Sequence, residues 1–189
     1  AFETETSLMP HVHLSVQHGD DIILKRMKRR HLARDVMRLF KELRRRRPDI
    51  VFGADLIAGF PTETEQAHLS TLALIEQAEL SHLHVFSYSD REGTPATKMP
   101  KTNPSDIRRR ASALREAGKK QYEKLLSNHL NKPDEILLEK SNQGYLRNFI
   151  RVNLSHHELL PSGHLHKVKI TQAHSNGNDT PSVIAELVE

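Results

Sequence analysis

The chain has 189 residues, 37% of them hydrophobic, which is enough for one domain or two small ones with a modest core. It has no cysteine, which excludes disulfides and any iron–sulfur cluster whose thiolates come from this chain. The net charge of +4 permits a polyanionic partner. No apolar run is long enough to span a membrane and no signal-peptide pattern is present, so we expect a cytoplasmic protein without membrane segments.

Strand-like and helix-like segments alternate over the first 130 residues. In chain order they are a strand (11–17), an amphipathic helix (19–49), a strand (50–60), a helix (63–79), a strand (82–89) and a basic helix (about 104–130). Strands that are each followed by a helix predict right-handed βαβ units and a parallel sheet.

Each of the three predicted strands has one apolar face and one face with polar groups. In the second strand, Phe52, Ala54 and Leu56 lie on one side, and Asp55 and Ile57 on the other. A doubly wound sheet would make both faces apolar. A βα barrel instead packs its apolar face under the helices and has its site at the carboxyl ends of the strands. We therefore expect the last part of a TIM-like βα barrel, with Asp55 in its lumen.

Beyond residue 131 the pattern changes to short alternating segments, separated by turns rich in Gly, Asn, Ser and Pro. This predicts a small all-β module, most simply a barrel. We place the domain boundary so that residues 1–131 form the βα part and residues 132–189 form the β module.

Basic and aromatic residues are mixed in the first half of this module. The candidate RNA-binding residues are Lys140, Tyr145, Arg147 and Arg151, because they offer both phosphate contact and base stacking. The alternative is ordinary hairpin alternation with Phe149 in the core.

Two segments at strand ends are candidates for a ligand site. Asp55, Gly59 and Glu63 place an acid, a glycine that permits close backbone approach, and a second acid around the end of the second strand. Gln17 ends the first strand and can both donate and accept hydrogen bonds. Taken alone, the second-strand segment is better explained by a structural aspartate followed by a turn and a helix.

Paired histidines raise the question of a metal site. The pairs are His11/His13, His82/His84, His156/His157 and His164/His166. No pair comes with a clear third ligand, and a protein site needs three or four. The sequence therefore predicts polar lumen or surface histidines and no metal site.

Three segments in order carry a family resemblance. They are MPHVHLSVQHGDDIILKRMKRRH (9–31), DLIAGFPTETE (55–65) and HLHVFSYSDREGTPA (82–96). Together they resemble the latter half of the radical S-adenosylmethionine (SAM) domain of the methylthiotransferases, and the C-terminal module resembles the TRAM domain that ends those proteins. KRMKRRH and FGADLIAGFPTET are closest to the branch that modifies threonylcarbamoyladenosine in tRNA.

The resemblance implies a fold and a function. It implies the C-terminal half of a radical SAM βα barrel followed by a TRAM barrel, within a transferase that inserts a methylthio group into threonylcarbamoyladenosine beside the anticodon of tRNA. The implied cofactors are S-adenosylmethionine and 4Fe-4S clusters, whose ligands would lie outside this chain because it has no cysteine. The chain would then be the inactive C-terminal part of the enzyme.

The resemblance also assigns residues. Those matched to S-adenosylmethionine binding are Gln17, Asp55, Gly59, Glu63, Phe86 and Tyr88, while no residue is assigned to catalysis. His18 and Glu92 depart from the family's Ser and Pro. Two alternatives stay open: a ribosomal-protein aspartate methylthiotransferase of the same family, and a non-catalytic RNA-binding protein that keeps a relic half barrel.

Overall fold

The computed structural model describes residues 2–155, 160–174 and 182–188. It forms two compact units, one of Val12–Gln121 and one that joins Ala1–His11 to Tyr122–Glu189. The division falls within the helix Pro104–Ser127, and the boundary after residue 131 remains a prediction of the sequence. The histidine pair at 156 and 157 lies outside the described residues. None of the described helices is both long enough and apolar enough to cross a membrane.

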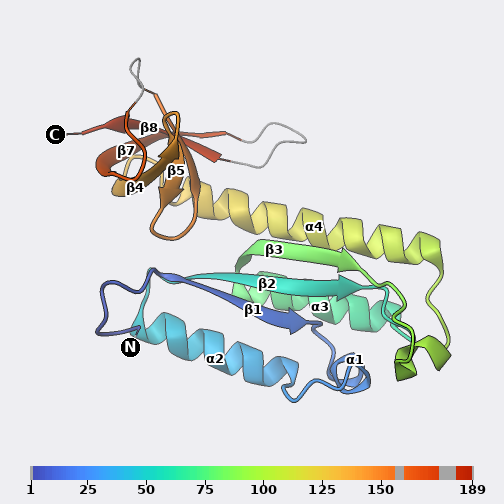
Figure 1. Cartoon of the computed structure of the whole chain (residues 1–189). Coiled ribbons are helices and arrows are strands. Elements are labelled where there is room, and N and C mark those ends of the chain that lie inside the picture. The colour runs from blue at the N-terminus through green and yellow to red at the C-terminus, as the bar shows by residue number, and fades with distance from the viewer. Residues whose placement is uncertain (1, 156–159, 175–181, 189) are drawn as a thin grey trace. The chain divides into compact units, whose positions relative to one another are not determined.

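The first unit is a three-stranded sheet with helices. Its strands are β1 (His11–Gln17), β2 (Val51–Ala58) and β3 (Leu80–Ser87), in that order across the sheet. Its helices are α1 (Asp21–Arg26), α2 (Ala33–Arg46), α3 (Glu65–Ala78), the short 3₁₀ helix η1 (Pro95–Lys98) and α4 (Pro104–Ser127). β2 and β3 pair in parallel, and Figure 1 shows all three strands running in one direction. The expected parallel α/β arrangement is confirmed.

The sequence predicts one helix over residues 19–49, and this is wrong, because the structure has α1 and α2 instead. The Asp20 side chain accepts hydrogen bonds from the backbone of Ile22 and Ile23 and caps α1. Lys28 then takes a left-handed conformation with φ 58°, which interrupts the helix. α2 begins anew where the Leu32 backbone donates to the Asp35 carboxylate at 3.0 Å.

One face of the sheet packs against helices and is most deeply buried at β2. Phe52, Ala54 and Leu56 on β2 have no exposed surface, and the Phe40 ring of α2 lies 4.3 Å from the Phe52 ring. On β3, Leu83 contacts α4 so closely at Gly118 that a Cβ there would collide with it. The opposite face keeps Asp55 and Ile57 half-buried. The expected division into a helix-covered apolar face and a polar face is therefore confirmed.

The second unit contains a closed five-stranded barrel in the order β4-β5-β6-β8-β7. Its strands are β4 (Pro133–Lys140), β5 (Gln143–Leu146), β6 (Arg151–Leu154), β7 (Leu165–His174) and β8 (Ser182–Leu187). Every second residue of β4 and β6 faces the core, so Ile136, Leu138 and Val152 are at most 1% exposed. The predicted all-β barrel is confirmed. Phe149 is 48% exposed and sits in the turn before β6, so the alternative that places it in the core is wrong.

Candidate functional site

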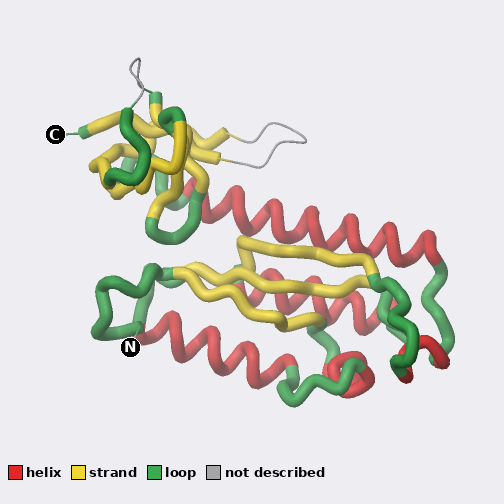
Figure 2. Tube along the Cα trace, in the orientation of Figure 1, coloured by secondary structure: helices red, strands yellow, loops and turns green. Residues whose placement is uncertain are grey.

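A pocket of about 640 Å³ opens at the carboxyl ends of the three parallel strands. Figure 2 shows the loops that leave these strand ends gathered at one end of the sheet. The pocket is lined by the ends of β1, β2 and β3, by the segment that follows α1, and by the loop that leads into η1. Its volume lies within the range of small-molecule sites, and its place matches that of sites in parallel βα folds.

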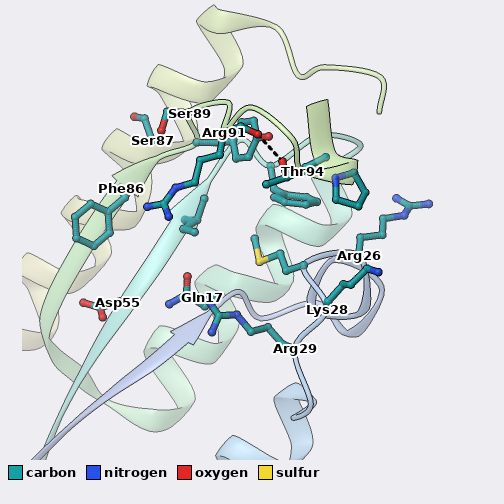
Figure 3. A pocket seen from close by; sticks show the side chains of 16 residues that line it. Gln17, Arg26, Lys28, Arg29, Asp55, Phe86, Ser87, Ser89, Arg91 and Thr94 are labelled. Atoms are coloured by element: carbon teal, nitrogen blue, oxygen red, sulfur yellow. Dashed lines mark hydrogen bonds between the residues drawn. The ribbon is translucent and has the colours of Figure 1, made fainter. Parts of the chain in front are cut away.

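Four of the six residues assigned to cofactor binding line this pocket. They are Gln17, Asp55, Phe86 and Tyr88. Figure 3 shows Gln17 at the end of β1 and Asp55 and Phe86 on the neighbouring strands. Gln17 has φ 72° and its side chain is buried. Phe86, in contrast, leaves 54% of its surface exposed.

Gly59 and Glu63 do not line the pocket. The Glu63 side chain is fully buried, and its carboxylate accepts a hydrogen bond from the Gly59 backbone N–H. Gly59 has φ 80°, and a Cβ at this position would collide with Ile107 of α4. Together they fix the turn that follows β2, and this turn carries the chain from the strand toward α3.

His18 completes the buried surroundings of Glu63. Its Nδ1 accepts from the Asp20 backbone N–H at 3.0 Å, so Nε2 is the protonated nitrogen, and it lies 3.3 Å from Glu63 Oε1. Arg110 approaches the other carboxylate oxygen at 3.6 Å. Nearby, burial lowers the pKa of His68. The histidine that departs from the family's serine thus serves as a partner of the buried acid.

Four cations also line the pocket, namely Arg26, Lys28, Arg29 and Arg91. Within the described part of the chain, none of the four forms an ion pair with a carboxylate. Arg26 donates to Thr62 Oγ1 at 2.5 Å. In Figure 3, Arg26, Lys28 and Arg29 come from the segment around α1 and Arg91 from the loop after β3. The sequence did not assign Arg26, Lys28 or Arg29 to this pocket, and the available signal was the density of basic residues between positions 25 and 30.

Apolar side chains fill much of the remaining wall. The rings of Phe60 and Tyr88 meet edge to face with centroids 5.3 Å apart, and Met27 and Ile57 add aliphatic surface. The Tyr88 hydroxyl donates to Asp90 at 3.2 Å, and desolvation together with this bond raises the pKa of Tyr88. The pocket therefore offers flat apolar surface, hydrogen-bonding groups and free positive charge.

Asp55 is held by side chains from both neighbouring strands. Its Oδ1 lies 3.0 Å from His13 Nε2 on β1 and 3.2 Å from His84 Nδ1 on β3, and its Oδ2 accepts from Ser15 Oγ at 3.0 Å. Burial alone would raise the pKa of Asp55, but these hydrogen bonds outweigh it and hold the pKa below its usual value. Asp55 is therefore an ionised, oriented acceptor.

The candidate RNA-binding residues lie on neighbouring segments of the barrel. Tyr145 on β5 pairs directly with Arg151 on β6, and Lys140 ends β4. Arg147 follows β5, and its guanidinium donates to the Thr6 carbonyl at 2.6 Å. The structure thus brings a base and an aromatic ring together at Tyr145 and Arg151, while Arg147 is engaged with the N-terminal segment.

Comparison with known proteins agrees with this geometry. Residues 5–75 match the family model described as "Radical SAM superfamily". In addition, 164 residues covering 86% of the chain are 48% identical to the threonylcarbamoyladenosine tRNA methylthiotransferase MtaB of Rickettsia prowazekii. The match to the radical SAM superfamily thus extends over residues 5–75 of the chain.

Other relatives carry names of the same kind. An MtaB of Thermotoga maritima is 42% identical over 63% of the chain, and a tRNA-2-methylthio-N(6)-dimethylallyladenosine synthase of Ehrlichia chaffeensis is 44% identical over 57%. The expected resemblance to the methylthiotransferases is confirmed. The chain spans only 38% of the Rickettsia protein, 28% of the Thermotoga protein and 24% of the Ehrlichia protein.

Proposed function

We propose that this chain is part of a radical SAM methylthiotransferase that modifies threonylcarbamoyladenosine in tRNA. The observation that carries this proposal is the 48% identity to a protein of that name, which extends over 86% of the chain. The pocket at the carboxyl ends of the strands supports it independently, because it lies where parallel βα folds place their sites.

The pocket residues suit S-adenosylmethionine in charge and shape. The methionine carboxylate of this cofactor needs a cation, and Lys28, Arg29 and Arg91 are available in the pocket wall. Its ribose hydroxyls and ammonium group need acceptors, which Asp55 and Gln17 supply. The exposed Phe86 ring offers a flat surface for the adenine.

Each part of the chain then has a definite task. When bound, S-adenosylmethionine with its iron–sulfur cluster would supply the radical chemistry of the family. Asp55 and Gln17 would orient the cofactor, and the Phe60 and Tyr88 rings would exclude water from one side of it. The buried Glu63 and Gly59 would hold the turn after β2 in shape. The chain has no cysteine, so it supplies no thiolate for a cluster.

We further propose that the C-terminal barrel is a TRAM-like module that binds tRNA. Five short strands close this barrel; Arg151 pairs with Tyr145, which is 36% exposed, and Lys140 ends the neighbouring strand β4. Such a combination permits phosphate contact together with stacking on an unpaired base. The barrel would hold the RNA while the parallel βα unit carries the cofactor.

The function is tested by deleting the gene and digesting total tRNA to nucleosides for mass spectrometry. We expect the methylthio form of threonylcarbamoyladenosine to disappear and its unmodified form to accumulate. Restoring the intact gene should reverse both changes. Unchanged methylthio nucleoside in the deletion strain would contradict the proposal.

A further inference from the structure

Two histidines and one aspartate converge on the polar face of the sheet, one from each strand. His13 comes from β1, Asp55 from β2 and His84 from β3, and Asp55 and His84 are direct partners in the parallel register. His13 Nε2 lies 3.0 Å and His84 Nδ1 3.2 Å from the same oxygen, Asp55 Oδ1. The two imidazole rings lie with centroids 4.7 Å apart.

The spacing of these atoms suits a metal ion. One ligand atom from each residue can be chosen so that all three lie within 4.8 Å of one another. Ligands bonded at about 2.1 Å to a tetrahedral ion lie roughly 3.4 Å apart. The observed 3.0 and 3.2 Å are close to this value. Little movement of the side chains is therefore needed to admit an ion between them.

The Asp55 carboxylate is also oriented by a hydrogen bond to its second oxygen, as carboxylate ligands are in metal sites. Ser15 Oγ donates to Asp55 Oδ2 at 3.0 Å, which directs Oδ1 toward the two imidazoles. Partners of this kind orient the ligands of known metal sites and raise their affinity. All three candidate ligands stand on adjacent strands of one sheet, so their separation is fixed by backbone pairing.

Solvent reaches the group of His13, Asp55 and His84 from one side. The His84 side chain is 66% exposed, whereas those of His13 and Asp55 are 26% exposed. An ion can therefore enter from the His84 side and keep one or more positions for water or another ligand. Two imidazoles and one carboxylate with open positions are the donor set of zinc and non-haem ferrous sites.

We propose that His13, Asp55 and His84 bind a divalent transition-metal ion of the zinc and ferrous class. This proposal differs from the expectation drawn from the sequence, where no histidine pair shows a clear third ligand. The third ligand comes from the strand between them. The site goes beyond the proposed function and does not depend on it, although both use Asp55: with an ion bound there, Gln17 would remain the acceptor for S-adenosylmethionine.

Titration of the 189-residue chain with Co²⁺, followed by its visible absorption, tests this site. We expect one strong visible band that saturates with increasing Co²⁺ and is abolished by Zn²⁺. His13→Ala and His84→Ala should each weaken Co²⁺ binding at least about tenfold, and Ser15→Ala should weaken it about 10- to 100-fold. Because His84 is largely exposed, its replacement should leave the fold intact, which circular dichroism can verify.

Two histidines provide matched controls. His82→Ala removes a histidine two positions away on the same face of β3, and His164→Ala removes an exposed one in the barrel unit. Both variants should keep the Co²⁺ band and affinity of the unaltered chain. Absence of the band, or equal affinity in the His84→Ala variant, would overturn the proposal. No S-adenosylmethionine is present in this titration, so such a failure would leave the proposed methylthiotransferase function standing.

Discussion

Gln17 combines an unfavourable backbone with a buried polar side chain at the pocket. Its φ of 72° lies in the left-handed region, which residues other than glycine adopt rarely. Such conformations persist where the surrounding structure requires them and gather at ligand sites. Here the conformation ends β1 and brings the amide into the pocket wall. The strain at Gln17 is therefore consistent with a role in binding.

Replacing Gln17 with alanine should weaken S-adenosylmethionine binding by the full-length protein. The loss of one hydrogen bond to a charged or polar ligand costs about 1–3 kcal/mol, which is roughly a 5- to 150-fold rise in Kd. Isothermal titration calorimetry measures this directly. Gln172→Ala, an exposed glutamine of β7, is the control and should bind normally. Equal affinity in both variants would remove Gln17 from the site.

At the scale of elements, two adjacent arginines of α4 tie this helix to the start of α3. Arg110 is 5% exposed, donates to the Glu63 carbonyl at 2.8 Å and lies 3.6 Å from the buried Glu63 carboxylate. Arg109 forms two hydrogen bonds to Glu65 at 3.1 and 2.7 Å, but both of these side chains are about half exposed. An arginine–glutamate pair thus occurs once in the interior and once at the surface.

Arg110→Ala should destabilise the protein far more than Arg109→Ala. Removing Arg110 leaves the Glu63 charge buried without its cation, which costs about 3–5 kcal/mol. Removing Arg109 breaks an exposed pair that solvent screens, which contributes little to stability. Urea unfolding of the two variants under identical conditions provides the comparison. Similar losses in both would show that Glu63 does not depend on Arg110.

The pair of Glu65 and Arg109 also predicts a dependence on pH. Hydrogen bonds from Arg109 lower the pKa of Glu65 from 4.5 to about 2. A depressed carboxylate pKa stabilises the folded state above pH 4.5, and this contribution is lost as the pH falls toward 2. The unfolding midpoint of the Glu65→Gln variant should therefore fall less steeply between pH 4.5 and pH 2 than that of the unaltered chain. Glu116→Gln, an exposed glutamate of α4, should leave the decline unchanged, and 1 M salt should reduce the effect of Glu65.

For the molecule as a whole, the alternation of apolar and polar residues predicts the strands and their buried faces better than it predicts contacts between individual residues. The apolar and polar faces of β2 follow from residue parity alone, as do the strands of the barrel. The interruption at Lys28 does not, because the helical pattern continues through it. The metal candidate was also missed, because residues 42 and 29 positions apart meet Asp55 only through strand register. Contacts between residues far apart in the chain are the part of the structure that a single sequence does not reveal.

The proposed binding of tRNA depends on where charge lies on the surface and not on the net charge alone. The chain has 28 Lys and Arg against 24 Asp and Glu, so its net charge is only +4. We expect the barrel surface around Lys140, Tyr145 and Arg151 to provide the contacts. Because cations on phosphates release counterions, the affinity of the full-length protein for tRNA should fall with rising salt.

Two kinds of substitution should separate the contributions of charge and stacking. Lys140→Ala combined with Arg151→Ala should reduce the slope of log K against log salt by about 1.4–1.8, because each lost phosphate contact removes about 0.7–0.9. Tyr145→Ala should weaken binding by about 1–3 kcal/mol and leave that slope unchanged. Arg38→Ala, which removes a cation already paired with Asp35, is the control. Fluorescence anisotropy over a salt series measures all three, and a slope that is unaltered in the double variant would place the RNA on another surface.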